Sequence, residues 1–280
     1  NWREITDTQR NQLVEESVAK AMEEYQTTVF DSSARNKSMA GRIRRMTDRT
    51  LWALGCQWEH GAYEKTWHEL DFGRAGGNGV TLPVEEGLEL SLRGRIDRVD
   101  FAEEDGSLYV KVIDYKSGST KLDLGKVYYG LQLQLVLYLE AAMAMAAKRN
   151  PNRKLIPAGI YYYNMKDPIV SGFDMTKEEI EAKQQKELRM NGLTSTEKAS
   201  LLLIDAEGGN VVSGLEYKKD GSLSSRALVA NADQMHELGH FARKKTLDLA
   251  RDIYGGKIDA YPYEYKKMNP CEYCEYGSVC

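Results

Sequence analysis

The 280-residue sequence predicts one mixed α/β domain in which helices flank a central sheet. Apolar residues recur with a helical period in several long segments, and they alternate with period two in others. The two kinds of segment are interleaved along the chain, which is typical of mixed layered folds. Neither an internal repeat nor a low-complexity linker interrupts residues 1–280, so we expect a single domain.

Composition and charge limit the classes of protein to consider. A hydrophobic content of 42% is enough for a core in a chain of this length. The net charge of −4 means that DNA binding would need local positive charge, because stand-alone DNA-binding domains are more often basic. No apolar run reaches 18 residues and no signal peptide is present, so we expect no membrane span and a cytoplasmic location. Because residue 1 is Asn rather than Met, we expect a fragment of a longer protein.

Two helices are predicted first, over 8–28 and 38–60, because apolar residues recur there at helical spacing. One face of the second helix is dense in basic side chains. These are Arg35, Lys37, Arg42, Arg44, Arg45 and Arg49. We interpret this face as solvated rather than as a DNA-binding patch.

Strands follow, because the period changes to two near Trp67. The pattern predicts a strand over 66–72 and a glycine-rich turn over 73–79. Asp105-Gly106 is a strong signal for a tight turn between two strands. The alternation that starts at Leu88 therefore predicts one antiparallel hairpin over 88–114.

The second half of the chain alternates in the same way. A leucine- and alanine-rich helix is predicted to begin at Asp123 and to end before Asn150-Pro151. The remaining predictions are a strand over 157–163 with buried tyrosines, helices over 176–192 and 196–203, a short strand pair over 211–217, a helix over 231–254 and an irregular tail over 255–280.

The hairpin carries the residues with the clearest chemical potential. Asp114 and Lys116 are two residues apart in a strand, so both side chains point to one face. Asp97 lies at a comparable distance from the turn and is expected opposite Asp114. Two carboxylates and the Tyr115 carbonyl would form an oxygen site suited to Mg²⁺ or Mn²⁺. A nearby lysine would steady an attacking water or the charge on a phosphate, so this set predicts phosphodiester hydrolysis.

Two glycines flank this set of residues. Gly94 precedes the first carboxylate and Gly118 follows the lysine. Because glycine lacks a side chain, we expect both positions to leave room for a ligand.

The same segments resemble a known family. RecB-type PD-(D/E)XK nucleases have motifs similar to GRIDRVD at 94–100 and VIDYKSG at 112–118. Gln134 and Tyr138 are similar to that family's Q-x-x-x-Y motif and share a helical face. The resemblance implies a restriction-endonuclease-like fold, with Gln134 and Tyr138 lining the DNA cleft beside the metal.

Further segments resemble the C-terminal nuclease domain of the AddB family, the B subunits of bacterial AddAB helicase–nucleases. The similar segments are RMTDR at 45–49, ELDFG at 69–73, PAG at 157–159 and the C-terminal cysteines. The resemblance implies a metal-dependent DNA exonuclease that processes double-strand ends for recombinational repair. Its implied partners are DNA, with a single strand in the cleft, and an AddA-like subunit.

Three of the four cysteines lie in the last ten residues, as Cys271, Cys274 and Cys280. This C-x2-C-x5-C spacing predicts metal or iron–sulfur ligation in a reducing compartment. The AddB resemblance implies a [4Fe-4S] cluster whose fourth ligand lies upstream of this chain, which leaves Cys56 as an ordinary thiol. It also implies an upstream metal-binding histidine with no match here, so both sites are expected to be incomplete.

Two alternative functions stay open at this point. His236, Glu237 and His240 form an H-E-x-x-H motif that on a helix could bind Zn²⁺ in a metallopeptidase. Gly239 would loosen that helix, and Glu264 is the only third ligand we can suggest. The chain could also be a DNA-binding or scaffolding module that is inactive in isolation. A P-loop motif is missing, so the chain has no ATP site of that kind.

Overall fold

A computed structural model describes residues 5–24, 32–73, 80–266 and 269–279, without the Tyr273 side chain. The predicted turn over 74–79, the end of the first helix at 25–28 and Cys280 lie outside the described residues. The strands are β1 (Lys65–Phe72), β2 (Val80–Glu85), β3 (Leu88–Leu92), β4 (Gly94–Glu104), β5 (Ser107–Lys116), β6 (Lys154–Asn164), β7 (Asn191–Ser195) and β8 (Val229–Ala230). The helices are α1 (Asp7–Glu24), α3 (Ala34–His60), α4 (Leu124–Tyr128), α5 (Gln134–Arg149), α6 (Lys177–Glu187), α7 (Lys198–Ile204), α8 (Ala232–Tyr254) and the 3-10 helix η2 (Pro270–Tyr273).

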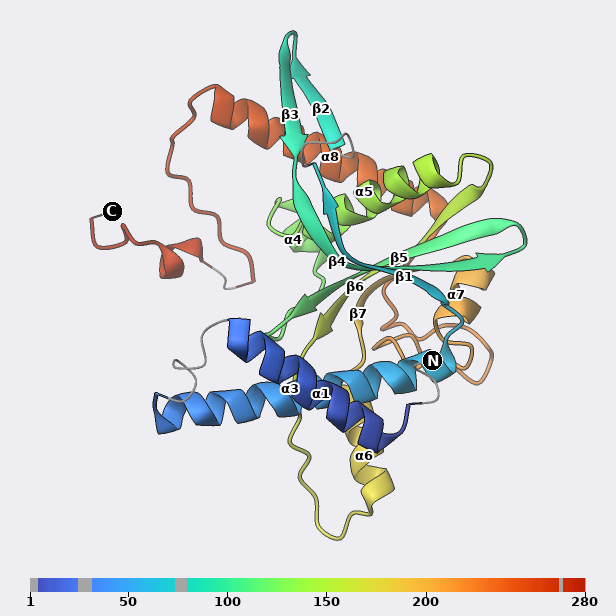
Figure 1. The fold of residues 1–280 in the computed structure, drawn as a ribbon. Helices are drawn as coiled ribbons and strands as arrows, with labels where there is room; N and C mark the ends of the chain where they lie inside the picture. Colours follow the sequence, from blue (N-terminus) through green and yellow to red (C-terminus); the bar gives the residue numbers. More distant parts are fainter. Residues whose placement is uncertain (1–4, 25–31, 74–79, 267–268, 280) are drawn as a thin grey trace.

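The main sheet has six strands in the order β1-β4-β5-β6-β7-β8. Pairing is antiparallel for β1/β4, β4/β5 and β6/β7, and it is parallel for β5/β6 and β7/β8. Figure 1 shows α4, α5 and α8 on one side of this sheet and α1, α3, α6 and α7 on the other. The predicted mixed α/β fold is therefore confirmed.

Each face of the sheet has its own hydrophobic core. Towards α5 and α8 the core includes Val110, Val112 and Leu135, and towards α3 and α7 it includes Ile113 and Tyr161. Strand β5 is buried from its first residue to Asp114, as expected for a strand covered on both faces. The predicted burial of Tyr161, Tyr162 and Tyr163 is also confirmed.

The prediction of one hairpin over 88–114 is wrong. Strand β3 pairs with β2 in a separate two-stranded sheet, and the hairpin that carries the acidic residues is β4–β5 alone. Figure 1 shows β2 and β3 extending away from the main sheet beside α8. The alternating leucines of β3 gave no indication of which strand is its partner.

The predicted helix over 123–148 is interrupted. It consists of α4 and α5, because Gly130 takes a left-handed conformation with φ +84° after α4 ends. Its predicted ends are confirmed, since Asp123 caps α4 and Asn150 caps α5. The interruption makes Gln134 the first residue of α5, which places it at the end of the helix nearest to Lys116.

The predicted helix over 176–192 is also too long. Helix α6 ends at Glu187, and β7 begins at Asn191 as a strand of the main sheet. The sequence of β7, NGLTS, is polar although its last three residues are buried, so its pattern gave no strand signal. Only isolated bridges occur in the predicted pair over 211–217, whereas the final helix is confirmed as α8.

A search of the described helices found none with the length and apolar character needed to cross a bilayer.

Candidate active site

The predicted acidic pair lies where β4 and β5 separate. The regular β4/β5 ladder ends at the pair Arg98 and Ile113, one residue before Asp97 and Asp114 would face each other. Asp97 uses its side chain at this point, where Oδ2 accepts a hydrogen bond of 2.8 Å from the Tyr115 amide. The carboxylate of Asp97 is thereby fixed to the strand that carries Asp114.

Asp114 is almost fully buried, with 2% of its surface exposed. Burial raises the pKa of its carboxyl group, the Lys116 ammonium opposes this shift, and the neighbouring Asp97 carboxylate raises the pKa further. In the described part of the chain no well-aligned hydrogen bond reaches Asp114 Oδ2, and its ion-pair partner is Lys116 Nζ at 2.6 Å. Two adjacent carboxylates, one of them buried, fit a divalent cation, because a cation would offset their repulsion and desolvation.

Lys116 connects the acidic pair to α5. Its Nζ donates a hydrogen bond of 3.1 Å to Gln134 Oε1, and Gln134 Nε2 donates one of 2.9 Å to the Tyr138 hydroxyl. The side chains of Asp114, Lys116, Gln134 and Tyr138 therefore form one continuous polar chain. The predictions that Asp114 and Lys116 share a face, and that Gln134 and Tyr138 share another, are confirmed.

Tyr162 is a neighbour of this array that sequence reasoning did not assign to it. It pairs with Asp114 across the parallel β5/β6 register, and Lys116 Nζ lies 5.5 Å from its ring centre. Burial and the Asp114 carboxylate raise the pKa of Tyr162 to about 12. Only the register of β5 against β6 would have identified it.

Gly94 has a different role from the one expected. A Cβ atom at this position would come within 2.8 Å of the Phe72 ring and 3.4 Å of the Tyr138 ring. Phe72 and Tyr138 pack edge to face with ring centres 5.8 Å apart, so Gly94 leaves space for these rings rather than for a ligand. At Gly118 a Cβ would meet nothing within 4 Å, as expected.

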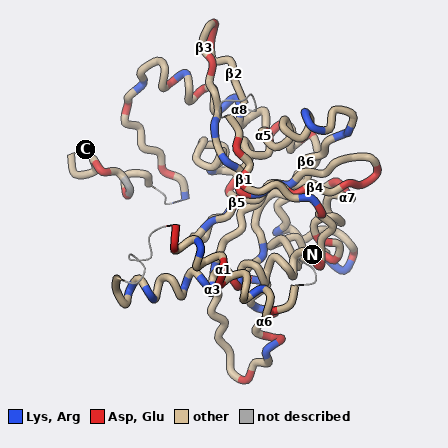
Figure 2. The backbone as a smooth tube through the Cα atoms, in the orientation of Figure 1, with Lys and Arg blue, Asp and Glu red and all other residues tan. Residues whose placement is uncertain are grey.

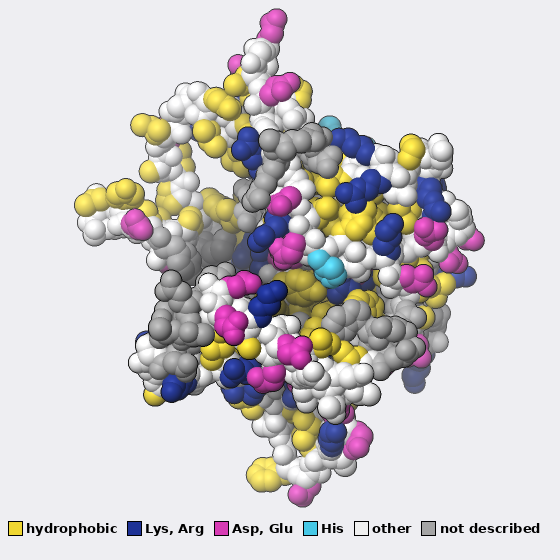
Figure 3. Space-filling model, viewed as in Figure 1, with side chains coloured by type: hydrophobic (Ala, Val, Ile, Leu, Met, Phe, Trp, Pro, Cys, Tyr) yellow, Lys and Arg dark blue, Asp and Glu magenta, His cyan; other side chains and the backbone are white. Residues whose placement is uncertain are grey.

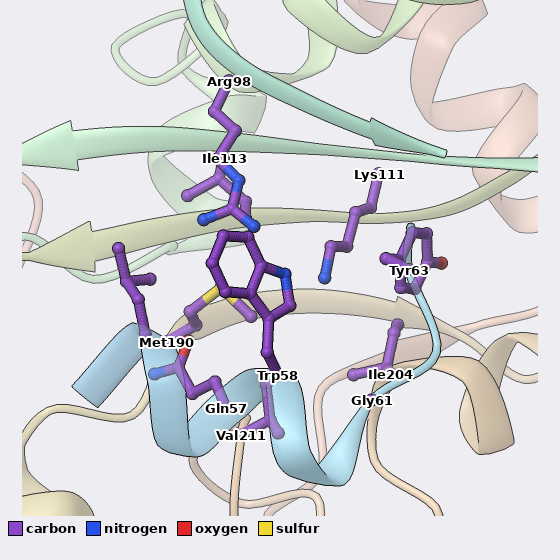
Figure 4. Close-up of a pocket in the computed structure, with 11 residues that line it drawn as sticks. Gln57, Trp58, Gly61, Tyr63, Arg98, Lys111, Ile113, Met190, Ile204 and Val211 are labelled. Atoms are coloured by element: carbon purple, nitrogen blue, oxygen red, sulfur yellow. The ribbon is translucent and has the colours of Figure 1, made fainter. Parts of the chain in front are cut away.

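A buried charged cluster supports the hairpin from the opposite face. Arg98 donates to both Asp100 oxygens, at 2.7 Å and 2.8 Å, and Lys111 Nζ lies 3.3 Å from Asp100 Oδ2. Figure 4 shows Arg98 and Lys111 extending from the sheet towards α3, near Trp58 and Tyr63. Arg98 also donates to the Tyr115 hydroxyl at 3.3 Å, so the cluster contacts the residue whose amide holds the predicted metal ligand on β4. Sequence analysis did not identify this cluster.

The H-E-x-x-H motif does not form a metal site in the structure. His236 and His240 are exposed on α8, and no group of three His, Cys, Asp or Glu side chains suited to a metal occurs among the described residues. Gly239 is buried, and a Cβ there would collide with the Glu140 carboxylate of α5. This glycine therefore permits close packing of α5 against α8, and the zinc peptidase alternative is not supported.

Positive charge is dispersed rather than gathered into one surface. On the face shown in Figure 3, basic and acidic side chains are interspersed, and Figure 2 shows both kinds along most elements. In α3, Arg44 pairs with Glu15 at 3.1 Å and Arg45 pairs with Asp167 at 3.0 Å. These ion pairs agree with the interpretation of the basic face of α3 as a solvated one.

Cys271 and Cys274 are exposed free thiols on η2 and at its end. The Cys274 amide donates to the Cys271 carbonyl at 3.2 Å, so one helical turn separates the two residues. Two exposed thiols at this spacing fit two ligands of an iron–sulfur cluster. Cys56 differs from them, because it is half-buried in α3 and burial raises the pKa of its thiol.

The residues that surround Asp114 allow a prediction about stability. A carboxyl group whose pKa is raised by folding destabilises the folded state at pH values above that pKa. Asp114→Asn should therefore raise the melting temperature of the metal-free protein at pH 7, and the gain should shrink as the pH falls towards 3.8. Thermal unfolding in EDTA at several pH values would measure this. A variant less stable than the parent at pH 7 would contradict it.

Comparison with known proteins adds independent information. A sequence profile of the PD-(D/E)XK nuclease superfamily matches residues 3–280. Three curated relatives are each named as the B subunit of an ATP-dependent helicase/deoxyribonuclease, and all of this chain aligns with each of them. They come from Lachnoclostridium phytofermentans (38% identity, 24% of the relative's length), Caldanaerobacter subterraneus subsp. tengcongensis (34%, 24%) and Clostridium kluyveri (32%, 25%). The chain thus spans about a quarter of the length of these relatives. Both resemblances drawn from the sequence are confirmed.

Proposed function

Because this chain belongs to the PD-(D/E)XK nuclease superfamily, we propose that it is a divalent-metal-dependent deoxyribonuclease domain that hydrolyses phosphodiester bonds. The observation that carries the proposal is the continuous polar chain from Asp114 through Lys116 and Gln134 to Tyr138. It lies beside a second carboxylate, Asp97, whose charge acts on Asp114.

Each residue of the array has a separate proposed role. Asp97, Asp114 and the Tyr115 carbonyl would hold Mg²⁺ or Mn²⁺. When bound, such an ion polarises a phosphodiester and lowers the pKa of a coordinated water. Lys116 donates hydrogen bonds to the attacking water or to the phosphate oxygens as negative charge develops on them.

Gln134 and Tyr138 would position the lysine and the DNA. Gln134 accepts a hydrogen bond from Lys116, so it limits the directions in which the ammonium group can point. Tyr138 is held in turn by Gln134 and by the Phe72 ring. We propose that these two side chains line the DNA cleft.

The relatives suggest a place for this activity. Their printed name describes one of the subunits of an ATP-dependent helicase/deoxyribonuclease. We propose that the chain is the exonuclease domain of such a protein, that it acts with an AddA-like subunit in the cytoplasm, and that it processes double-strand DNA ends for recombinational repair. We further propose that residues 1–280 form one domain with a cysteine-rich tail over 255–280.

We also propose that Cys271, Cys274 and Cys280 bind a [4Fe-4S] cluster together with a fourth ligand from outside this chain. Iron and sulfide content per chain, measured after anaerobic purification, should fall in Cys271→Ser and Cys274→Ser. Cys56→Ser is the matched control and should leave the iron content unchanged. Iron content that is equal in the parent and in all three variants, or zero throughout, would contradict this assignment.

The nuclease proposal can be tested with end-labelled linear DNA. The protein should degrade this DNA with Mg²⁺ or Mn²⁺ and should leave it intact in EDTA. Binding of DNA without any cleavage in the presence of either metal would instead favour the alternative of a DNA-binding module that is inactive in isolation.

A further inference from the structure

A groove lies beside the active site, between the loop that follows Lys116 and the start of the C-terminal tail. Its volume is about 640 Å³, within the usual range for ligand sites. Ser119, Lys121 and Lys126 line one side, and Tyr265 and Lys266 line the other. Ser119 is three residues after Lys116, so the two Cα atoms lie within roughly 11 Å of each other. The groove therefore begins next to the proposed catalytic lysine.

Hydrogen bonds from the tail fix the two sides of the groove. The Tyr265 hydroxyl donates to Asp123 Oδ1 at 3.1 Å, and Lys266 Nζ donates to Asp123 Oδ2 at 2.8 Å. Tyr265 packs directly over Gly125, where a Cβ would collide with its ring and hydroxyl. Figure 1 shows the tail passing on the α4 side of the sheet. The groove is thus a built feature with specific contacts between its two sides.

The loop side is held equally well from the rest of the fold. Asn164 accepts a hydrogen bond from the Thr120 amide at 2.8 Å, and Asn191 accepts one from the Leu122 amide at 3.0 Å. Gln132 accepts a third from the Asp123 amide at 2.9 Å. Side chains from β6, from β7 and from the segment before α5 therefore fix the loop backbone.

The charges that line the groove are predominantly positive. Lys121, Lys126 and Lys266 contribute three positive charges, and Asp123 contributes one negative charge that Lys266 pairs with. Within the described ranges, Lys121 and Lys126 have no ion-pair partner. The groove therefore carries two uncompensated cations in a protein whose net charge is −4. Local positive charge of this kind is what a phosphate backbone requires.

Aromatic rings continue the same surface along α4. Tyr128 is 60% exposed and Tyr129 is 46% exposed. The Tyr128 ring stacks on Phe241 with an interplanar angle of 9°, and Tyr129 lies against Tyr263 and Tyr265. Neighbouring rings thus hold both tyrosines in place while much of their surface stays exposed. Rings of this kind stack with unpaired bases in proteins that bind single strands.

We propose that this groove binds single-stranded DNA next to the bond that is cleaved. Lys121 and Lys126 contact backbone phosphates, and Tyr128 stacks with a base. The occupant is a single strand rather than a duplex, because paired bases cannot offer a face to an aromatic ring. The inference rests on the proposed function, since it takes the strand from the nuclease site into the groove.

The lysines can be tested by binding of a fluorescent 20-nucleotide oligothymidylate in EDTA, followed by anisotropy over a series of salt concentrations. For a single strand, the logarithm of the binding constant falls with the logarithm of salt by about 0.7 per phosphate neutralised. The double variant Lys121→Gln/Lys126→Gln should therefore bind more weakly, with a slope that is shallower by roughly 1.4. The matched control is Lys218→Gln/Lys219→Gln, which removes two exposed lysines from a distant turn and should leave the slope unchanged.

The stacking contact has its own test. Tyr128→Ala should weaken binding of the same oligonucleotide by roughly 5-fold to 150-fold, the range for loss of one stacked base. Tyr128→Phe keeps the ring and should bind as the parent does. Folding is checked by the melting temperature, and Tyr128 is suited to substitution because most of its surface is exposed.

Both measurements omit divalent metal, so they do not depend on cleavage. Weaker binding by the lysine and alanine variants would support the groove even if the parent proved unable to cleave DNA. Parent-like binding by these variants, or no oligonucleotide binding by the parent, would overturn the groove proposal even if the parent cleaved DNA well.

Discussion

Asp114→Asn should reduce Mg²⁺-dependent cleavage of linear DNA to about 1% of the parent rate or less. Removal of a residue that merely supports a metal ligand usually costs 10-fold to 100-fold in affinity or activity, so loss of a direct ligand should cost at least about 100-fold. Asparagine keeps the shape of the side chain and removes the charge that faces Asp97 and Lys116. Initial rates on end-labelled DNA would measure the loss.

A matched control for this variant is Asp105→Asn. Asp105 is exposed at the turn of the same β4–β5 hairpin, where asparagine tolerates its φ of +48°. This control should cleave at the parent rate. Unfolding cannot explain the loss if Asp114→Asn melts at or above the parent temperature in EDTA, as expected from the raised pKa of Asp114. Cleavage by Asp114→Asn at more than a tenth of the parent rate would remove Asp114 from the proposed site.

Asp100→Asn should lower the free energy of unfolding by about 3–5 kcal/mol, because it removes one partner from a buried ion cluster. Asp100 is fully buried and is the common partner of Arg98 and Lys111. Burial already lowers the pKa of Lys111 to about 8, and Asp100 opposes that shift. Without Asp100 the lysine can lose its proton near neutral pH, so we expect a loss near the lower end of this range.

Urea unfolding at pH 7 would measure this loss, with Glu103→Gln as a control in the same strand. Glu103 pairs with Arg153 at the surface, where ion pairs contribute at most about 1 kcal/mol. The double variant Asp100→Asn/Lys111→Met should recover part of the loss, since it removes one of the two unpaired cations. If Asp100→Asn is as stable as Glu103→Gln, the cluster does not stabilise the hairpin.

Much of the active site could be predicted because it depends on local sequence. The alternation within β5 fixes the common face of Asp114 and Lys116, and the Asp105-Gly106 turn brings Asp97 to the same end of the hairpin. The spacing of Gln134 and Tyr138 likewise follows from one helical turn. These are contacts between residues that are close in sequence or joined by one tight turn.

The residues that were missed depend on contacts between distant segments. Tyr162 reaches the site through the β5/β6 register, and the partners of Lys111 come from β4 and from the segment after α3. The break before α5 rests on the backbone of Gly130, which the leucine-rich pattern around it conceals. Strand β7 was missed because its buried side chains are polar and find partners only in the folded chain, as Thr194 does with the Tyr161 hydroxyl.

The most direct test of the central claim is calorimetric titration of Mn²⁺ into the parent, Asp114→Asn and Asp105→Asn. If Asp97 and Asp114 hold the metal, the parent should bind one Mn²⁺ per chain. Asp105→Asn should bind it equally well, and Asp114→Asn should bind it at least about tenfold more weakly. Equal Mn²⁺ affinity in Asp114→Asn and the parent, or no binding by the parent, would contradict a metal site at the end of the β4–β5 hairpin.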